Sequence, residues 1–366
     1  MMKHIRSVLC LLLAAVLLAG CSILPGKKEP EAPAPTDPLT GRALQWQGQR
    51  PVAVTIENAS DSTTQWGISS ASVVLEALTE AGTPTELCLV YPALDAMPRV
   101  GPIAAGQDLY WRLLVGQQVL PIQRGGGRFD QNYLDYYSLR AVDALEAGRR
   151  AFDCDAAWNN APLWYTSGKA VSGVLESLGI SSELTASRVT TAASAAADST
   201  SAAADTVLSV PALLPQEEDG KLPDATVSDA ANVQIHFDAD NTTGFAYDAD
   251  TGLYRMLHAD GTPQLDADNG QQAGFDNLLV LFSASELRDD NATYDYDLTM
   301  GGGVWLNGGH LWSITWTQGQ DSTLLFYDAD GRTMNISAGT SYIALVSVLT
   351  GKELAVTTST GDSLIG

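Results

Sequence analysis

The chain has 366 residues, with 20 Lys and Arg against 43 Asp and Glu and a formal net charge of −23. This length favours two domains over one small core. The acidity excludes nucleic-acid binding, because such proteins need a basic surface to displace phosphate counterions. It also disfavours attachment to anionic membranes through surface charge.

The N-terminus predicts export and lipidation. A short basic region precedes the apolar run 8–18, which is too short to span a bilayer and is typical of a secretory signal. Leu18-Ala19-Gly20-Cys21 resembles a bacterial lipobox, in which the cysteine thiol carries diacylglycerol and becomes the new N-terminus. We therefore expect residues 1–21 to be a lipoprotein signal peptide and Cys21 to be lipidated, with palmitate-type chains. An ordinary signal peptide with an incidental cysteine is the alternative.

Two cysteines, Cys88 and Cys154, remain once the signal is removed and Cys21 carries lipid. An exported protein can form disulfides, so a bond between them is one possibility. Cys88 lies within an apolar run, which favours a buried free thiol instead. The sequence leaves both open.

The first half alternates expected strands and helices. Residues 22–37 are rich in proline and predict an extended tether. The following segment, 38–184, predicts an α/β domain from alternating strand and helix patterns. The expected strands are 52–56, 87–91 and 119–122, and the expected helices are 108–120, 132–150 and 171–178. In 69–80, helix and strand compete.

The second half has a β pattern. Residues 185–229 are rich in Ala and Ser and predict a partly disordered linker or insertion, with a transient helix as the alternative. Residues 230–355 predict a mainly antiparallel β domain, and 356–366 a tail. Its expected strands are 233–237, 278–282, 312–316 and 324–327, separated by Asp-Gly and Asn-Gly turns. The expected fold is therefore α+β overall.

Short segments in both halves share their order and spacing with a known family. They are Asp37–Gly41, Arg50–Asn58, Gly67–Ser69, Val73–Glu76 with Glu80, Val100–Pro102, Tyr165–Ser167, Tyr294–Gly303, Gly309–Trp316, Phe326–Gly331 and Thr340–Val346. Together they resemble the YerB-like bacterial lipoprotein family, whose two halves are called domain of unknown function 3048. The family has no established reaction, so the resemblance implies architecture and location.

The chain departs from the family pattern at its arginines and histidines. The resemblance implies arginine, a small residue, alanine and arginine where the chain has Ala104, Ala105, Gly106 and Gln107. It implies histidine at Gln123 and His-Asn at Pro162 and Leu163, and the chain departs again at Gln264. Histidines and arginines are the natural proton carriers and anion clamps of a pocket. Their joint replacement implies that an ancestral site was lost or changed.

Paired carboxylates are the enzymatic candidate. Glu76 and Glu80 are four residues apart and would share one face if the segment is helical, and Glu57 could approach from the end of the first strand. A close pair in a cleft could act as acid and base, as in glycosidases. The alternative is a solvated helix face.

A glycine turn flanked by cations is the candidate binding site. Two arginines bracket it in the sequence Arg124, Gly125, Gly126, Gly127, Arg128. Backbone amides and guanidinium groups there could clamp a carboxylate or phosphate, with Tyr165 and Thr166 completing the pocket. In the alternative, the arginines pair with Asp130 or Asp135.

We expect neither a metal nor a cofactor. The histidines lack metal-ligand spacing, and the Asp266, Asp268, Asn269, Gly270 loop is explained by a hairpin turn more simply than by calcium. Trp305 and Trp312 could stack on sugars or peptides, although core packing is favoured for at least one of them.

Together these patterns predict binding rather than catalysis. The expected protein is anchored through Cys21 to the extracytoplasmic face of the bacterial cell membrane and binds an envelope polymer or a protein partner. The alternatives are an envelope glycan or peptide hydrolase using paired carboxylates and a non-catalytic scaffold.

Overall fold

The computed structural model describes residues 35–58, 64–155, 162–185, 210–217, 224, 227–319, 321–349 and 354–365. All of them belong to one compact unit, Pro35–Gly366. The expected signal peptide, the lipobox and nearly all of the tether lie outside the described residues. Within the described ranges, no helix has the length and apolar character needed to cross a bilayer.

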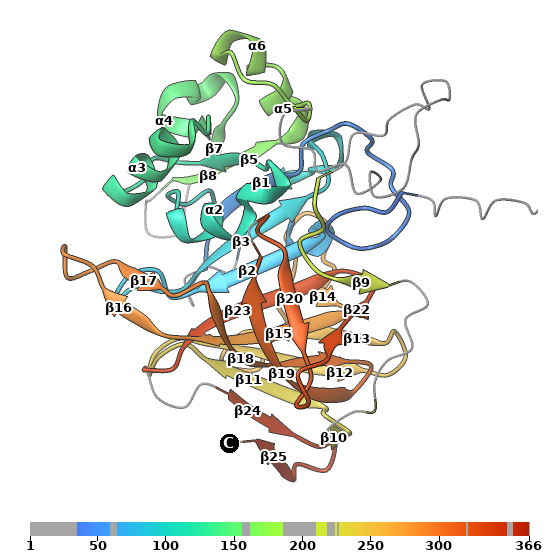
Figure 1. The fold of residues 1–366 in the computed structure, drawn as a ribbon. Coiled ribbons are helices and arrows are strands. Elements are labelled where there is room, and N and C mark those ends of the chain that lie inside the picture. The colour runs from blue at the N-terminus through green and yellow to red at the C-terminus, as the bar shows by residue number, and fades with distance from the viewer. Residues whose placement is uncertain are drawn as a thin grey trace, which may run out of the picture. The chain divides into compact units, whose positions relative to one another are not determined.

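Strands from both halves of the chain form one large sheet (Figure 1). Its order is β21 (Thr333–Met334), β20 (Leu324–Tyr327), β19 (His310–Gln318), β18 (Met300–Asn307), β15 (Asn277–Ser283), β23 (Ser341–Ser347), β2 (Val73–Ala77), β3 (Glu86–Tyr91), β1 (Val52–Glu57), β5 (Leu120–Gln123) and β6 (Val142–Asp143). A twelfth strand, β10 (Val227–Ser228), pairs with β19. The halves meet where β2 and β23 pair in parallel, with Val73 opposite Ser341.

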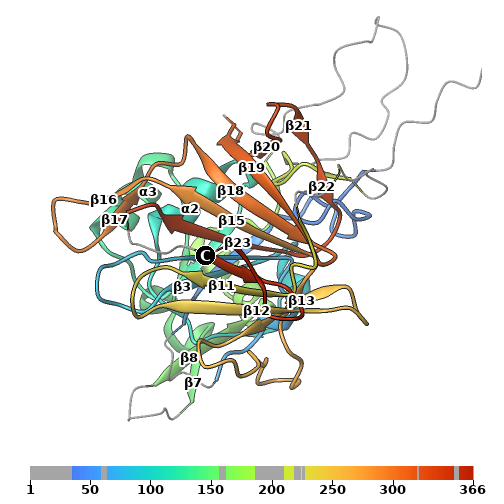
Figure 2. The same cartoon turned by 90° about the horizontal axis from the view of Figure 1, so that it is seen from below.

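A six-stranded sheet packs against one face of the large sheet (Figure 2). Its order is β14 (Gly274–Phe275), β13 (Leu253–Leu257), β12 (Thr242–Asp248), β11 (Asn232–His236), β24 (Leu354–Thr357) and β25 (Ser363–Ile365). The core between the sheets includes Phe245 and Tyr342, whose ring centroids are 4.7 Å apart. The expected tail, 356–366, therefore contains sheet strands, because its apolar residues pair with β11 and each other.

Among the described residues, the unit also contains three smaller sheets and five α-helices. The sheets are β16 (Ser285–Leu287) with β17 (Tyr294–Tyr296), β22 (Ile336–Ser337) with β9 (Gln216–Glu217), and β4 (Arg99–Val100) with β8 (Leu163–Ser167) and β7 (Asp153–Asp155). The helices are α2 (Asp108–Leu114), α3 (Arg128–Tyr137), α4 (Ala144–Ala147), α5 (Gly168–Ser172) and α6 (Leu175–Leu178). Single 3-10 turns are η1 (Ile68–Ser70), η2 (Leu94–Ala96), η3 (Val115–Gln117) and η4 (Gly148–Arg150). The expected α+β class is confirmed.

The structure decides one expectation that the sequence left open and corrects another. The contested segment 69–80 forms strand β2, because β-branched Val73 and Val74 suit a strand that pairs on both sides. The expected continuous helix 132–150 is wrong: α3 ends at Tyr137, and helical structure resumes only at Ala144, in α4. Ser138 takes a left-handed conformation (φ 52°), and β6 then joins the sheet beside β5. Leu145, expected in a buried stripe, is 71% exposed.

The described part of 185–229 contributes to the core. It contains β9 and β10, and Leu213 and Leu214 are fully buried on the second face of the large sheet. Trp305 and Trp312 lie in the same core, stacked with ring centroids 4.2 Å apart. Core packing is therefore confirmed for both tryptophans.

Candidate functional site

The predicted glycine turn lies at the carboxyl ends of three parallel strands. Strands β1, β5 and β6 run in parallel and end at Glu57, Gln123 and Asp143. Ligand sites in parallel sheets lie at this edge. The glycine turn follows β5 directly, and the amide of Gly125 donates to a carboxylate oxygen of Asp143 at 2.9 Å.

The turn packs tightly against the start of α3. Asp130, in the first turn of that helix, accepts hydrogen bonds from the Trp111 indole at 2.6 Å and the Gln123 amide at 2.9 Å. A Cβ at Gly126 would overlap the Asp130 carboxylate, whereas nothing lies within 4 Å of one at Gly127. Burial raises the pKa of Asp130 to about 6, although the hydrogen bonds from Trp111 and Gln123 oppose this shift.

The two flanking arginines contact different elements. The Arg124 guanidinium lies 5.6 Å from the Trp164 ring on β8. Arg128 pairs with Asp289, in the connection between β16 and β17, and its guanidinium lies 4.5 Å from the Phe129 ring. Arg128 thus has a different acidic partner from the expected Asp130 or Asp135. A clamp formed jointly by the two arginines stays a prediction.

Two further carboxylates, Glu57 and Glu86, lie at the same edge of the sheet. Glu57 faces Glu86 across the antiparallel β1–β3 pair, which places their side chains on one face of the sheet. Burial is the largest cause that raises the pKa of Glu86, to about 7, and the charges of Glu80 and Glu57 raise it further. A hydrogen bond with Gln107 opposes the shift. Burial also raises the pKa of Glu57, against the nearby charge of Arg124.

Glu76 lies on the opposite face, so the proposed catalytic glutamates do not converge. It is fully buried, and its carboxylate accepts hydrogen bonds from Tyr342 at 2.5 Å, Thr85 at 2.7 Å, Thr243 at 2.8 Å and Asn58 at 3.1 Å. Burial raises its pKa. Glu76 and Glu80 do not share a helix face, because Glu76 belongs to strand β2, which ends at Ala77, and Glu80 lies beyond it in an isolated bridge with Thr293.

Tyr165 and Thr166 contact segments other than the glycine turn. The Tyr165 ring packs edge-on against Trp66 at 5.4 Å, while its neighbour Trp164 contacts Arg124. Thr166 is buried, and its hydroxyl donates to the Ala151 carbonyl at 2.6 Å. That these two residues complete a pocket with the arginine–glycine segment stays a prediction.

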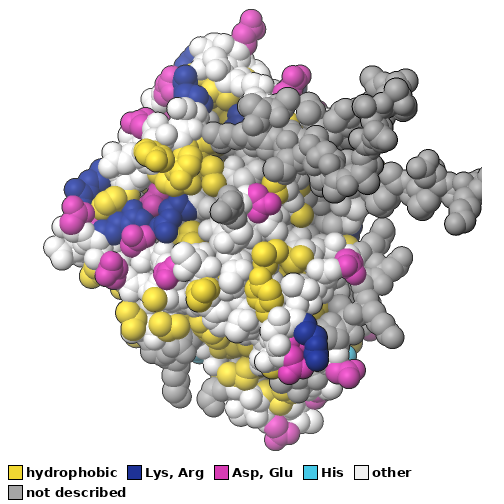
Figure 3. Space-filling model, in the orientation of Figure 1, with side chains coloured by type: hydrophobic (Ala, Val, Ile, Leu, Met, Phe, Trp, Pro, Cys, Tyr) yellow, Lys and Arg dark blue, Asp and Glu magenta, His cyan; other side chains and the backbone are white. Residues whose placement is uncertain are grey.

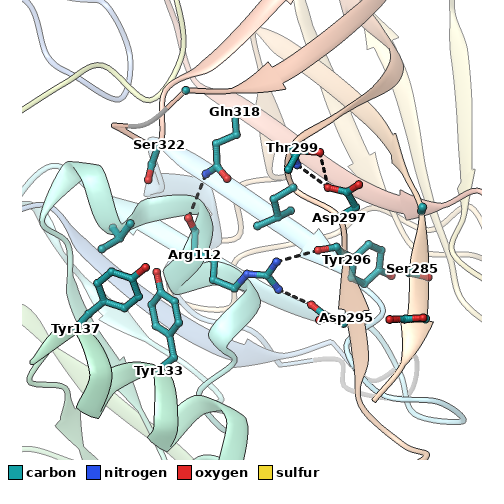
Figure 4. A pocket seen from close by; sticks show the side chains of 15 residues that line it. Arg112, Tyr133, Tyr137, Ser285, Asp295, Tyr296, Asp297, Thr299, Gln318 and Ser322 are labelled. Atoms are coloured by element: carbon teal, nitrogen blue, oxygen red, sulfur yellow. Dashed lines mark hydrogen bonds and ion pairs between the residues drawn. The ribbon is translucent and has the colours of Figure 1, made fainter. Parts of the chain in front are cut away.

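A tyrosine-lined pocket of about 640 Å³ lies beside α3 (Figure 4). Tyr133 and Tyr137 form one wall, with ring centroids 4.6 Å apart. The other walls come from α2, η3 and segment 284–322 of the second half: they are Arg112, Val115, Ala284, Ser285, Glu286, Asp295, Tyr296, Asp297, Leu298, Thr299, Gln318, Gly319 and Ser322. Both halves of the chain thus build this pocket.

The charge inside the tyrosine-lined pocket is negative. Arg112 lines the pocket and donates to Asp295 at 2.6 Å and to the Tyr296 carbonyl at 2.9 Å. The walls add Glu286 and Asp297, so three carboxylates face one guanidinium. Basic and acidic side chains also interleave on the surface over α3 and the β16–β17 hairpin (Figure 3). The pocket suits a neutral or cationic ligand better than an anion.

Sequence reasoning missed this pocket, although one signal was present. Tyr133 and Tyr137 are four residues apart, which places both on one face of a helix. The missing information was the opposite wall, whose residues lie about 150 positions later in the chain. Glu86 was missed for a similar reason, because only strand register places it opposite Glu57.

The remaining sequence candidates have structural partners. Asp266 accepts hydrogen bonds from the Ser69 hydroxyl at 2.7 Å and amide at 3.2 Å, and Asp268 pairs with Arg99. These contacts fit the hairpin-turn interpretation of the loop. Cys88 and Cys154 are both free, and burial raises the pKa of the Cys88 thiol.

Comparisons with known proteins agree on one family. Residues 39–181 match the family model described as "Protein of unknown function (DUF3048) N-terminal domain", and residues 233–343 match its C-terminal domain. The chain is 22% identical over 299 residues to "Putative lipoprotein YerB" of Bacillus subtilis (strain 168), which covers 77% of each chain. The crystal structure of YerB from Bacillus subtilis matches with a TM-score of 0.68 at 20% identity, covering 85% of this chain and 96% of the other. This chain therefore belongs to the DUF3048 family and has the fold of YerB.

Proposed function

We propose that this protein is a lipid-anchored lipoprotein on the extracytoplasmic face of the bacterial membrane that binds an uncharged glycan of the cell envelope. The lipid at Cys21 would provide the attachment, as the lipobox pattern and the name of the YerB relative suggest. The observation that carries the binding proposal is the tyrosine-lined pocket between the two halves of the chain.

Two features of that pocket suit a saccharide. Paired tyrosine rings offer apolar faces for sugar rings, while their hydroxyls remain polar. Opposite them, carboxylate, amide and hydroxyl groups such as Glu286, Gln318 and Thr299 can hydrogen-bond sugar hydroxyls. The volume of about 640 Å³ lies within the range of small-molecule sites, roughly 300–1,000 Å³. Because its wall carboxylates outnumber Arg112, the pocket disfavours anionic polymers.

Two of the carboxylates support binding rather than hydrolysis in this pocket. Glu76 is buried, accepts four hydrogen bonds and lies on the face of the sheet opposite Glu57. Within the pocket, Asp295 is held by Arg112 and Arg288, which lower its pKa against the opposing effect of burial. A general acid needs a raised pKa, so this carboxylate is poorly suited to protonate a leaving group.

The binding test uses the intact lipoprotein purified in detergent. Isothermal titration with oligosaccharides of N-acetylglucosamine, which carry no charge, should give saturable binding, and Tyr137→Ala should weaken it at least tenfold. Tyr137 is 39% exposed, so truncation leaves the core packed. Tyr136→Ala is the matched control, because this neighbouring tyrosine is 81% exposed and lies outside the pocket wall.

Equal affinity of the Tyr137→Ala variant and the unsubstituted protein would refute the glycan site. Binding of stem peptides without glycan would assign the pocket to a peptide instead. The anchor is tested separately by Cys21→Ser, which should release the protein from the membrane fraction. Retention of that variant in the membrane would contradict lipid attachment at Cys21.

A further inference from the structure

We infer that a second pocket, lined by Arg99, Arg149 and Arg150, binds a phosphate ester. This arginine-lined pocket has a volume of about 200 Å³ and lies beside β7, β8 and α5. It is separate from the tyrosine-lined pocket, with which it shares no wall residue. The inference is therefore independent of the proposed glycan binding.

The charge of this pocket is opposite to that of the protein. Three arginines and one carboxylate, Asp153, are the charged residues of its walls. The whole chain has only 20 basic residues and a net charge of −23. A concave site with low-dielectric walls concentrates the field of its charges, so an anion would be attracted here despite the acidic surface elsewhere.

Among the described residues, no carboxylate forms an ion pair with Arg150. Its guanidinium donates to the carbonyls of Ala147 at 3.1 Å and Glu146 at 3.2 Å, and to the Ser177 hydroxyl at 3.3 Å. These three bonds hold the planar group while leaving two of its five N–H donors. Two donors on one guanidinium can bind two oxygens of a phosphate.

The other two arginines are also held in place. Arg99 lies between aromatic rings, 4.7 Å from Trp66 and 5.2 Å from Tyr165, and its guanidinium pairs with Asp268. Arg149 pairs with Asp153, but both side chains are 61% exposed. Exposed ion pairs contribute only about 0.2–1 kcal/mol, so a phosphate anion can compete for Arg149.

The pocket's size and polar groups favour a small ester. Its volume would hold about six or seven waters at roughly 30 Å³ each, which suits a phosphate with a short substituent. The Ser167 hydroxyl lines the pocket and accepts from the Ala170 amide at 3.3 Å. Its own proton is therefore free to donate to a ligand oxygen. Such an ester could belong to a soluble envelope polymer or to a phospholipid headgroup.

The test titrates the detergent-purified lipoprotein with glycerol 3-phosphate. In a second arm, the lipoprotein is reconstituted without detergent into phosphatidylcholine vesicles and titrated with acceptor vesicles of phosphatidylglycerol in phosphatidylcholine. Acceptor vesicles of phosphatidylcholine alone control for transfer of the anchor. Arg150→Gln should weaken binding at least tenfold, and Arg149→Gln should weaken it severalfold. Arg332→Gln makes the same charge change at an exposed turn, where the side chain is 74% exposed, and should bind like the unsubstituted protein.

Saturable binding of glycerol 3-phosphate that is lost in Arg150→Gln would support a soluble ester. Binding confined to phosphatidylglycerol vesicles, with the same loss, would support a headgroup. The inference fails if neither probe binds saturably or if both pocket variants bind like the unsubstituted protein. It also fails if Arg332→Gln loses as much affinity as the pocket variants. Thermal unfolding verifies that each variant is folded, and Arg149→Gln keeps the test valid if loss of Arg150 disrupts α4.

Discussion

Replacing Glu86 with glutamine should stabilise the protein in a pH-dependent way. Glu86 faces Glu57 across two strands, and burial together with the charges of Glu80 and Glu57 raises its pKa from 4.5 to about 7. The folded protein therefore binds this proton more tightly than the unfolded chain does. The stabilisation that the neutral form provides is fully present below pH 4.5 and is lost as the pH rises through about 7.

The size of the effect follows from the shift. At about 1.36 kcal/mol per pKa unit, ionising Glu86 in the folded state costs up to about 3 kcal/mol. Glu86→Gln removes this cost. The free energy of unfolding should rise by up to about 3 kcal/mol at pH 8, but by less than about 1 kcal/mol at pH 5.

Urea unfolding of both proteins at pH 5 and pH 8, followed by tryptophan fluorescence, measures this difference. Glu183→Gln is the matched control, because Glu183 is an exposed glutamate in the loop after α6. Its substitution should change stability little at either pH. An equal effect of Glu86→Gln at both pH values, or destabilisation at pH 8, would refute the assignment of the raised pKa to Glu86.

Three further predictions concern packing, each measured by the free energy of unfolding. Tyr342→Phe removes the 2.5 Å hydrogen bond to buried Glu76 and should lower the free energy of unfolding by about 1.5–3 kcal/mol. Tyr327→Phe makes the same change at a half-buried tyrosine and should lower it by less. Gly126→Ser should destabilise the protein by about 1–3 kcal/mol because its Cβ would overlap Asp130. Gly127→Ser is the control, because its Cβ has open space and serine is a favoured residue at this helix N-cap. Equal losses of stability in the two variants would contradict the packing at Gly126. Trp305→Ala should cost about 3–5 kcal/mol through lost core volume and stacking on Trp312; a loss below 1 kcal/mol would contradict that core.

Local patterns predicted the strands with strong β-branched or apolar runs. Residues 52–56 and 278–282 are strands in the structure because such runs suit buried positions in a sheet whatever their partners are. The turns were equally local. Gly331 takes a positive φ of 76° at the end of an Asp-Gly turn, a conformation that glycine adopts at little cost.

Predictions failed where distant pairing outweighed local preference. The segment 132–150 has helical spacing, but Val142 is fully buried in β6, beside β5. Leu213 and Leu214 lie in a stretch that reads as a linker, yet they fill the core beneath residues far away in the sequence. Short windows contain no information about these partners.

The sequence by itself determined the lipobox-like pattern at Cys21, the acidic composition, the main strands and the family resemblance. These depend on composition and on patterns a few residues long. Tertiary structure alone decided that Glu76 and Glu57 lie on opposite faces, that Glu86 opposes Glu57, and that Tyr133 and Tyr137 form a pocket wall with residues 284–322. Each depends on strand register or on contacts between segments more than a hundred residues apart, which fold together only when both halves bury their shared core.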